Sequence, residues 1–208
     1  MVTSLLALAT AAHAQAGNLV PAPSFDTELE FLANWENLSA GDVWTSLDFE
    51  DNPSSGSVRI NDDIPGADTG MAVISPCLPV TPGTIYQFSA WQFTPSPQPV
   101  VGYAALFLEW RDSCPSGALV GFPTVTSDVT LAWTFFSAVA PAPVSAHGAR
   151  LWLSAVRTPA SGTFSVYFDQ AFVPEPGREA AAVTAAASLA FVRRRRPGSL
   201  LRRAAPAD

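Results

Sequence analysis

The stretch 149–173, ARLWLSAVRTPASGTFSVYFDQAFV, indicates the class of fold. It contains two runs in which β-branched or aromatic residues alternate with small or polar ones, separated by a turn rich in Pro, Ser and Gly. Side chains of a strand point to opposite faces at successive positions, so this pattern is typical of paired β-strands. We predict that 149–173 forms an antiparallel hairpin and that a β domain ends at Val173.

The rest of the chain indicates an all-β fold. Its 208 residues include 19 prolines and 13 glycines but no lysine, which favours short strands and turns over long helices. Further strands are expected at 56–60, 70–75, 83–93, 102–112 and 131–139, with no helical period between them. We therefore predict a two-sheet antiparallel β-sandwich of the jelly-roll type over residues 17–173.

Residues 1–16, MVTSLLALATAAHAQA, have the apolar run and the small-x-small cleavage pattern of a signal peptide, although no basic residue precedes the run. Export to an oxidising compartment would make Cys77 and Cys114 a disulfide pair, since neither cysteine has a second thiol or a histidine nearby to build a metal site. The domain is also acidic, with four arginines against fifteen acidic residues between Asn18 and Phe172. This balance argues against nucleic-acid binding.

Several stretches together resemble the carbohydrate-binding-module-like jelly rolls attached to bacterial glycanases: NLVPAPSFD near the N-terminus, GTIYQFSAW, LAWTFFSAVAP and the two runs of 149–173. This resemblance implies a structural calcium ion that ties the two ends of the domain together, with Asp26 and Asp169 as its carboxylate ligands. Glu28 is a possible substitute for Asp26. Plain surface carboxylates are the alternative for both positions.

The C-terminal segment 174–208 differs from the domain. Val173, Pro174, Glu175 and Pro176 are followed by an apolar stretch at 180–192 and by Arg193, Arg194, Arg195 and Arg196. The segment resembles the PEP-CTERM sorting signal of Gram-negative bacteria, which implies cleavage by an exosortase-type membrane protease after transient membrane anchoring. The apolar stretch is short for a bilayer span, and an Ala-rich amphipathic or disordered tail is the alternative.

Strand alternation also nominates a binding site. Outside the core-facing sets, three strands each present an aromatic ring near hydrogen-bonding groups. Flat rings stack on the apolar face of a sugar, while amide, carboxylate and guanidinium groups bind its hydroxyls. The predicted ligand-binding residues are Trp91, Tyr103, Trp152, Gln87, Glu109 and Arg111, unless loops cover these rings; Trp110, Trp133 and Phe136 are assigned to the core.

These features predict an exported, non-catalytic protein of the cell surface or extracellular matrix that binds polysaccharide. A hydrolase triad lacks parts, because the exported domain has one histidine, His147, and no Gly-x-Ser-x-Gly motif. The alternatives are a structural or adhesive surface protein without sugar affinity and, more distantly, a small polysaccharide-active enzyme.

Overall fold

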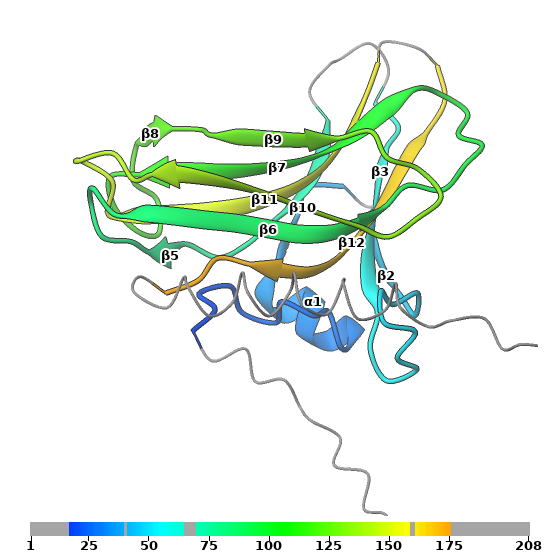
Figure 1. Ribbon diagram of the computed structural model, residues 1–208, viewed down its shortest axis with the longest axis horizontal. Coiled ribbons are helices and arrows are strands. Elements are labelled where there is room, and N and C mark those ends of the chain that lie inside the picture. The colour runs from blue at the N-terminus through cyan, green and yellow to red at the C-terminus, as the bar shows by residue number, and fades with distance from the viewer. Residues whose placement is uncertain (1–16, 40, 65–69, 159–160, 176–208) are drawn as a thin grey trace, which may run out of the picture. The chain divides into compact units, whose positions relative to one another are not determined.

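Two antiparallel β-sheets pack face to face in the computed structural model, which describes residues 17–39, 41–64, 70–158 and 161–175 (Figure 1). All of these residues belong to one unit of the chain, Met1–Pro176. The predicted signal peptide and nearly all of the predicted sorting segment, including Pro176, the apolar stretch and the four arginines, lie outside the described residues. The predicted all-β sandwich is confirmed.

The first sheet has seven strands among the described residues. Its main path runs β1 (Glu36–Asn37), β4 (Met71–Ile74), β11 (Gly148–Arg157), β7 (Gly102–Arg111) and β8 (Leu119–Gly121). Two short strands extend it: β5 (Leu78–Pro79) pairs with β11, and β9 (Thr124–Ser127) pairs with β7. The long β7–β11 pair forms the centre of this sheet.

The second sheet has five strands in the part of the chain that the structure describes. Its order is β10 (Thr134–Pro141), β6 (Ile85–Phe93), β12 (Phe164–Phe172), β3 (Ser57–Asp62) and β2 (Val43–Thr45). A register shift interrupts the β12–β6 pairing between Asp169 and Phe172.

The core lies between the sheets and follows the alternation of the sequence. Leu106, Leu108 and Trp110 of β7 point inward, as do Tyr86, Phe88 and Ala90 of β6, and all six are buried. Phe136 is also buried, so the assignments of Trp110 and Phe136 to the core are confirmed. The assignment of Trp133 is wrong: this side chain is only partly buried and packs against Phe93 and Phe49 on the outside of the second sheet.

The predicted closing hairpin is also wrong. β11 and β12 do not pair with each other but belong to different sheets, so that the chain crosses from one layer to the other between Arg157 and Phe164. Both strands have an apolar face that packs into the core. Such a face reaches the core in either of the two sheets, because the core lies between them. Alternation therefore identifies the strands without choosing their partners.

A short helix, α1 (Glu28–Asn34), which the sequence analysis did not predict, lies beside β2 (Figure 1). The Thr27 side chain caps it by accepting a hydrogen bond from the Glu30 backbone N–H, and Phe31 anchors it in the core. None of the helices among the described residues meets the length and apolarity needed to cross a membrane.

The two ends of the described domain lie together. The Leu19 N–H donates to the Val173 carbonyl at 2.8 Å, and Asn18 forms a β-bridge with Pro174. The stretch predicted to begin the sorting signal therefore starts inside the fold, since Val173 and Pro174 are buried, whereas Glu175 is exposed.

Candidate functional site: two outer faces of the sandwich

The six predicted ligand-binding residues do not form one site. Gln87 and Trp91 lie on β6, in the five-stranded sheet, whereas Tyr103, Glu109, Arg111 and Trp152 lie on β7 and β11, in the seven-stranded sheet. All six are placed outside the core cluster, but the two groups occupy opposite outer faces of the sandwich. Each face is therefore a separate candidate site.

The first candidate, which we call the seven-strand face, is centred on three rings. Trp152 lies opposite Phe107 in the β11–β7 register, and Phe122 joins them from the connection between β8 and β9. The Phe107 and Phe122 rings are stacked with centroids 4.9 Å apart, and Trp152 meets Phe122 edge-on at 5.7 Å. The face comprises Tyr103, Phe107, Glu109, Arg111, Phe122, Arg150 and Trp152.

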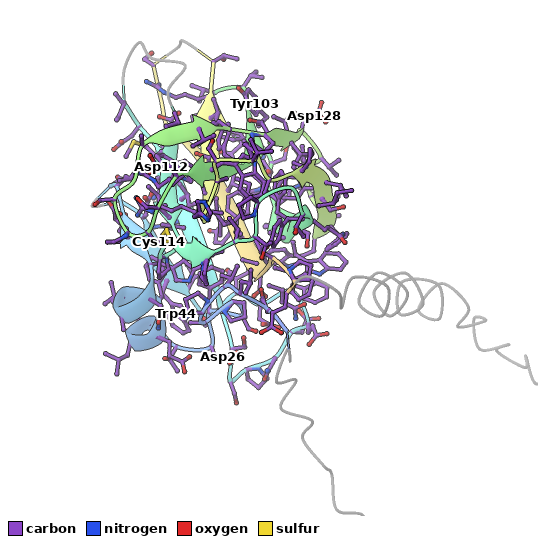
Figure 2. All side chains as sticks on the ribbon, turned by 90° about the vertical axis from the view of Figure 1, so that its left-hand side faces the viewer. Asp26, Trp44, Tyr103, Asp112, Cys114 and Asp128 are labelled. Carbon is purple, nitrogen blue, oxygen red and sulfur yellow. A yellow bond between two sulfur atoms is a disulfide. The ribbon has the colours of Figure 1, made fainter. Side chains whose placement is uncertain are left out.

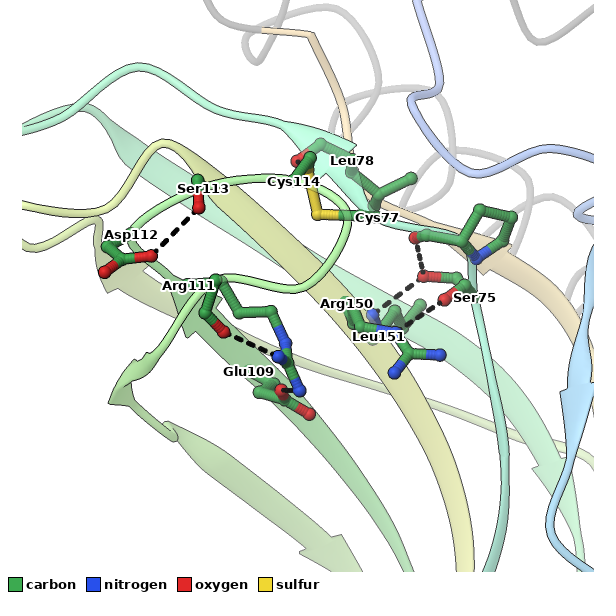
Figure 3. The surroundings of a disulfide bond; sticks show 12 residues. Ser75, Cys77, Leu78, Glu109, Arg111, Asp112, Ser113, Cys114, Arg150 and Leu151 are labelled. Carbon is green, nitrogen blue, oxygen red and sulfur yellow. Dashed lines mark hydrogen bonds and ion pairs between the residues drawn. A yellow bond between two sulfur atoms is a disulfide. The ribbon is translucent and has the colours of Figure 1, made fainter.

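Paired charges flank these rings on one side. Glu109 and Arg111 both lie on β7 and form an ion pair with each other. Arg150, on the neighbouring strand β11, forms an ion pair with Glu36. Glu109 is nearly fully buried, and Arg111 is its ion-pair partner there. Figure 3 shows Glu109, Arg111 and Arg150 side by side at the end of the sheet that carries the disulfide.

Backbone carbonyls fix both arginines in place. Arg111 donates from Nη1 to the Gly117 carbonyl at 2.7 Å, and Arg150 donates from Nε to the Ser75 carbonyl at 3.3 Å. The turn that contains Gly117 is itself closed by Asp112, whose carboxylate accepts from the Ala118 N–H at 2.9 Å. The polar groups of this face are thus ordered by the fold.

The predicted disulfide between Cys77 and Cys114 is present and supports the same turn (Figure 3). It joins the turn after β7 to the segment before β5, with a Cα–Cα distance of 5.6 Å. Gly148, at the start of β11, packs beneath it: a Cβ at this position would lie 2.7 Å from the Cys114 sulfur and 2.8 Å from the Cys77 sulfur. The close approach explains why glycine occupies this position.

Tyr103 lies at the other end of β7, opposite Val156. It is 36% exposed and four residues from Phe107, which corresponds to about 13 Å along a strand. In Figure 2 it appears at the edge of the domain opposite to Asp26. Tyr103 therefore shares the face with the ring cluster without being part of it.

The second candidate, the five-strand face, consists of Phe49, Arg59, Trp91, Phe93, Trp133, Phe135 and Tyr167. Phe49, from the loop after β2, stacks on Trp91 with centroids 4.0 Å apart. Trp91 also packs on Phe135 at 5.6 Å, and a second row runs Trp133, Phe93, Tyr167 with spacings of 5.7 and 5.9 Å. Arg59 continues this row, because it lies opposite Tyr167 in the β3–β12 register.

Gln87 is separated from this cluster. It lies four residues before Trp91 on β6, is half-buried, and pairs with Val139 at the other end of β10. Trp91 is thus the one residue of the predicted set that joins the described rings of the five-strand face.

The residues predicted to bind calcium lie at one end of the five-strand face. Asp169 is fully buried; its carboxylate accepts from the backbone N–H of Phe49 at 3.1 Å and from that of Gln170 at 2.6 Å. Burial, together with the neighbouring charge of Asp48, raises the pKa of Asp169 to about 8. Asp26 is exposed and contacts the hydroxyl of Ser55 at 2.9 Å.

Two buried carboxyl groups, Asp48 and Asp169, thus share one site beneath the loop after β2. Oxygen ligands of this kind suit a hard cation, which would stabilise the charged form of both groups. Within the described ranges, however, no three side chains of the metal-ligating types gather closely enough to hold an ion. Asp48, and not Asp26, is thus the carboxylate next to Asp169.

Sequence reasoning missed most of the ring partners. Phe107 was placed on an outer face but was not selected, while Phe122 and Phe49 lie in loops, where strand alternation says nothing. Arg59 and Tyr167 could have been found, because Val58 and Ile60 flank the first and Val166 and Phe168 flank the second, and these four residues point into the core. Asp48 carried no signal in the sequence.

No protein-family model matches this chain, and no curated protein sequence matches it. Solved structures do share its fold. An arabinose-bound α-L-arabinofuranosidase, MgGH51, matches with a TM-score of 0.55 and 14% identity over 76% of this chain and 26% of its own. The enzymatically active domain of bacteriophage CBA120 tailspike protein 4 matches with a TM-score of 0.54 and 15% identity over 76% and 21%.

A third match is the CBM22-1-GH10 fragment of Clostridium thermocellum xylanase 10B complexed with xylohexaose, with a TM-score of 0.51 and 19% identity over 77% of this chain and 29% of the fragment. This chain thus spans between a fifth and a third of the length of these three structures. At these identities the similarity concerns the β-sandwich fold alone.

Proposed function

We propose that this protein binds polysaccharide through the seven-strand face and carries out no chemistry on it. The observation that carries the proposal is the cluster of Phe107, Phe122 and Trp152 beside two ion pairs whose arginines are held by backbone carbonyls. Rings for stacking and ordered polar groups for hydroxyls are the two requirements of sugar recognition.

The charges of this face favour a neutral glycan. Arg111 is neutralised by Glu109 and Arg150 by Glu36, so that neither guanidinium is available to compensate an anionic group at low cost. Both arginines still have further N–H donors that can bind sugar hydroxyls. Because the turn after β7 is held by the disulfide, little ordering entropy would be lost on binding.

The rings and the ordered polar groups of this face support binding. A structural or adhesive role without sugar affinity is the main alternative, and a small polysaccharide-active enzyme is the third candidate. The experiment below separates all three.

The test is binding of the full chain to a panel of neutral soluble and insoluble glycans, measured by affinity electrophoresis and pull-down. We expect Trp152→Ala to weaken retention at least about tenfold, since interface aromatics dominate binding energies. Val144→Ala is the matched control, because Val144 is an 88% exposed apolar residue in the turn between β10 and β11 and belongs to neither set of face residues. Negligible retention of the parent protein would favour the structural role, and release of new reducing ends would establish an enzyme.

The proposal includes export and sorting. The signal-peptide pattern of 1–16 and the resemblance of 173–196 to a PEP-CTERM signal support a protein delivered to the cell surface or matrix after exosortase-type cleavage. Mass spectrometry of both termini of the native protein tests this part. Cleavage after Ala14 or Ala16 and a second cut near Pro176 are expected, whereas material that begins at Met1 and ends at Asp208 would contradict it.

We also propose one structural calcium ion at Asp48 and Asp169. The support is the burial of both carboxyl groups and the raised pKa of Asp169, which a bound cation would lower. The ion would hold the loop that carries Phe49 against the five-strand face.

A further inference from the structure

The five-strand face offers a second set of rings that the proposed function does not use. Six aromatic side chains are linked there by ring contacts of 4.0 to 6.4 Å: Phe49, Trp91, Phe93, Trp133, Phe135 and Tyr167. Phe135 is 39% exposed and the other five are half-buried, so the cluster borders solvent along its length. Its rings lie on two neighbouring rows, which is the shape of a platform.

The positively charged side chain of Arg59 lies at the end of one of these aromatic rows. Arg59 projects from β3 on the outer side, because its neighbours Val58 and Ile60 are fully buried in the core. In the register of the sheet it lies opposite Tyr167, which in turn lies opposite Phe93. The row Trp133, Phe93, Tyr167 therefore ends on a guanidinium group.

The pairing of Arg59 differs from that of the other arginines in the domain. Arg111, Arg150 and Arg157 form ion pairs with Glu109, Glu36 and Asp62, respectively. The Arg59 side chain forms no ion pair or hydrogen bond with the residues that the structure describes. Its Nε is buried without an acceptor, as is the Nε of Arg111, but Arg111 has an acidic partner and Arg59 has none. Arg59 as a whole is only half-buried, so an anion from outside would meet the part of the side chain that borders solvent and compensate its unpaired charge.

We infer that the five-strand face binds an acidic polysaccharide, with the carboxylate of a uronic acid on Arg59 and the sugar rings on the aromatic rows. A uronate carboxylate lies at the edge of the pyranose ring, so a sugar stacked on Tyr167 or Phe93 presents it sideways toward Arg59. The planar fork of arginine matches a carboxylate with two parallel hydrogen bonds. The domain is otherwise acidic and repels anions at a distance, so an anionic glycan would be held only by a local contact with Arg59.

This inference goes beyond the proposed function and does not depend on it. Together the two faces would let one molecule hold two glycan strands, a neutral one on the seven-strand face and an acidic one on the five-strand face. One molecule would then link two glycan strands, because the two faces lie on opposite sides of the sandwich.

The test compares galacturonate oligosaccharides with their methyl esters, which share the sugar rings and lack the charge. Titration calorimetry of the full chain at physiological salt should show at least about tenfold tighter binding of the free acid, as expected for a charge-assisted, bidentate contact. Arg59→Gln should remove this preference, and Arg59→Lys should keep only part of it because the ammonium lacks the fork. Phe135→Ala should weaken both oligosaccharides equally, with Val144→Ala as its control.

Each arm has an outcome that would overturn the inference. Equal binding of acid and ester by the parent protein, or a preference that survives in Arg59→Gln, would exclude Arg59 as the carboxylate partner. Equally tight binding of a sulfated oligosaccharide of the same charge would show a general anion site and exclude the uronate assignment. In Trp152→Ala, neutral-glycan retention should fall while the acid preference persists, so failure of one site is distinguishable from failure of the other; loss of the acid preference in that variant would place the carboxylate on the seven-strand face.

Discussion

The two outer faces of the sandwich carry similar rings but differ in how their charges are partnered. On the seven-strand face, Glu109 and Arg111 neutralise each other and Arg150 pairs with Glu36. On the five-strand sheet, Arg59 has no partner among the described residues, and two buried carboxyl groups, Asp42 and Asp169, have raised pKa values. Alternation along the strands thus places rings on both outer faces, while two acidic strand residues, Glu109 and Glu36, compensate the arginines of one face only.

The largest expected effect concerns the disulfide, which lies beside one face only. Replacing both Cys77 and Cys114 by serine should lower the free energy of unfolding by about 3–4 kcal/mol, because the bond closes a loop with a sequence separation of 37. Denaturant unfolding measures the loss. If the bond orders the turn that holds Arg111, neutral-glycan binding should fall while galacturonate binding stays; an equal fall in both would show that the bond serves the whole domain rather than one face.

The next effect concerns calcium beneath the loop of Phe49. At pH 8, calcium at about 100 times its dissociation constant should stabilise the parent protein by about 2.7 kcal/mol. Asp169→Asn should abolish this gain, since the buried carboxylate is lost. Thermal unfolding with calcium and with EDTA tests it, and Asp26→Asn is the comparison variant. A calcium-dependent shift that survives in Asp169→Asn and disappears in Asp26→Asn would restore the original ligand assignment.

A smaller effect is the pH dependence caused by Asp42, at the edge of the five-stranded sheet. Burial raises its pKa from 3.8 to about 7, although the Asn61 N–H donates to its Oδ1 at 3.0 Å. The folded state therefore holds a proton that the unfolded state releases, and stability falls as the pH rises from about 4 to about 7. Asp42→Asn removes the contribution of Asp42, while Asp169, whose pKa is raised to about 8, keeps its own.

Denaturant unfolding across pH 4 to 8 measures the effect. The variant should match the parent protein near pH 4 and exceed it by about 2 kcal/mol at pH 8. A gap of the same size at both pH values would show that the carboxyl group does not titrate in this range.

The smallest effect is expected for Glu36→Gln on the seven-strand face. The Glu36 side chain is 54% exposed, and exposed ion pairs contribute about 0–1 kcal/mol. Unfolding should change little, but Arg150 would lose its compensating charge. We expect the variant to acquire a weak preference for galacturonate over its methyl ester, which Arg150→Gln in the same background should remove. Absence of any such change would mean that pairing of charges does not set the difference between the faces.

Much of the fold was predictable, because burial imposes a period of two on every strand. The inward sets of β6, β7 and β11 were all assigned correctly from alternation. The same reasoning could not show that β11 pairs with β7 and not with β12. Both β7 and β12 have an alternating apolar face that could be buried beside β11. The helix at 28–34 was overlooked despite its signal, a threonine cap followed three residues later by a glutamate.

The candidate site was predictable only in part. Outward positions of Trp91, Tyr103 and Trp152 follow from parity, but parity does not say on which sheet a strand lies. The sequence could not bring Phe122 onto Phe107 or Phe49 onto Trp91, because loops place these rings. Trp133 was assigned to the core for its size, although it packs on the outside of the sheet.

By itself, the sequence determined the class of fold, the core-facing side of each long strand, the disulfide and the acidic character of the domain. All of these depend on local periodicity or composition, which need no knowledge of distant neighbours. Only the tertiary structure decided that the predicted ligand residues divide between two faces and that Arg59 lacks the partner its fellow arginines have. Those facts depend on which strands share a sheet and where loops fold back, and such long-range contacts are not encoded in the spacing of residues along one strand.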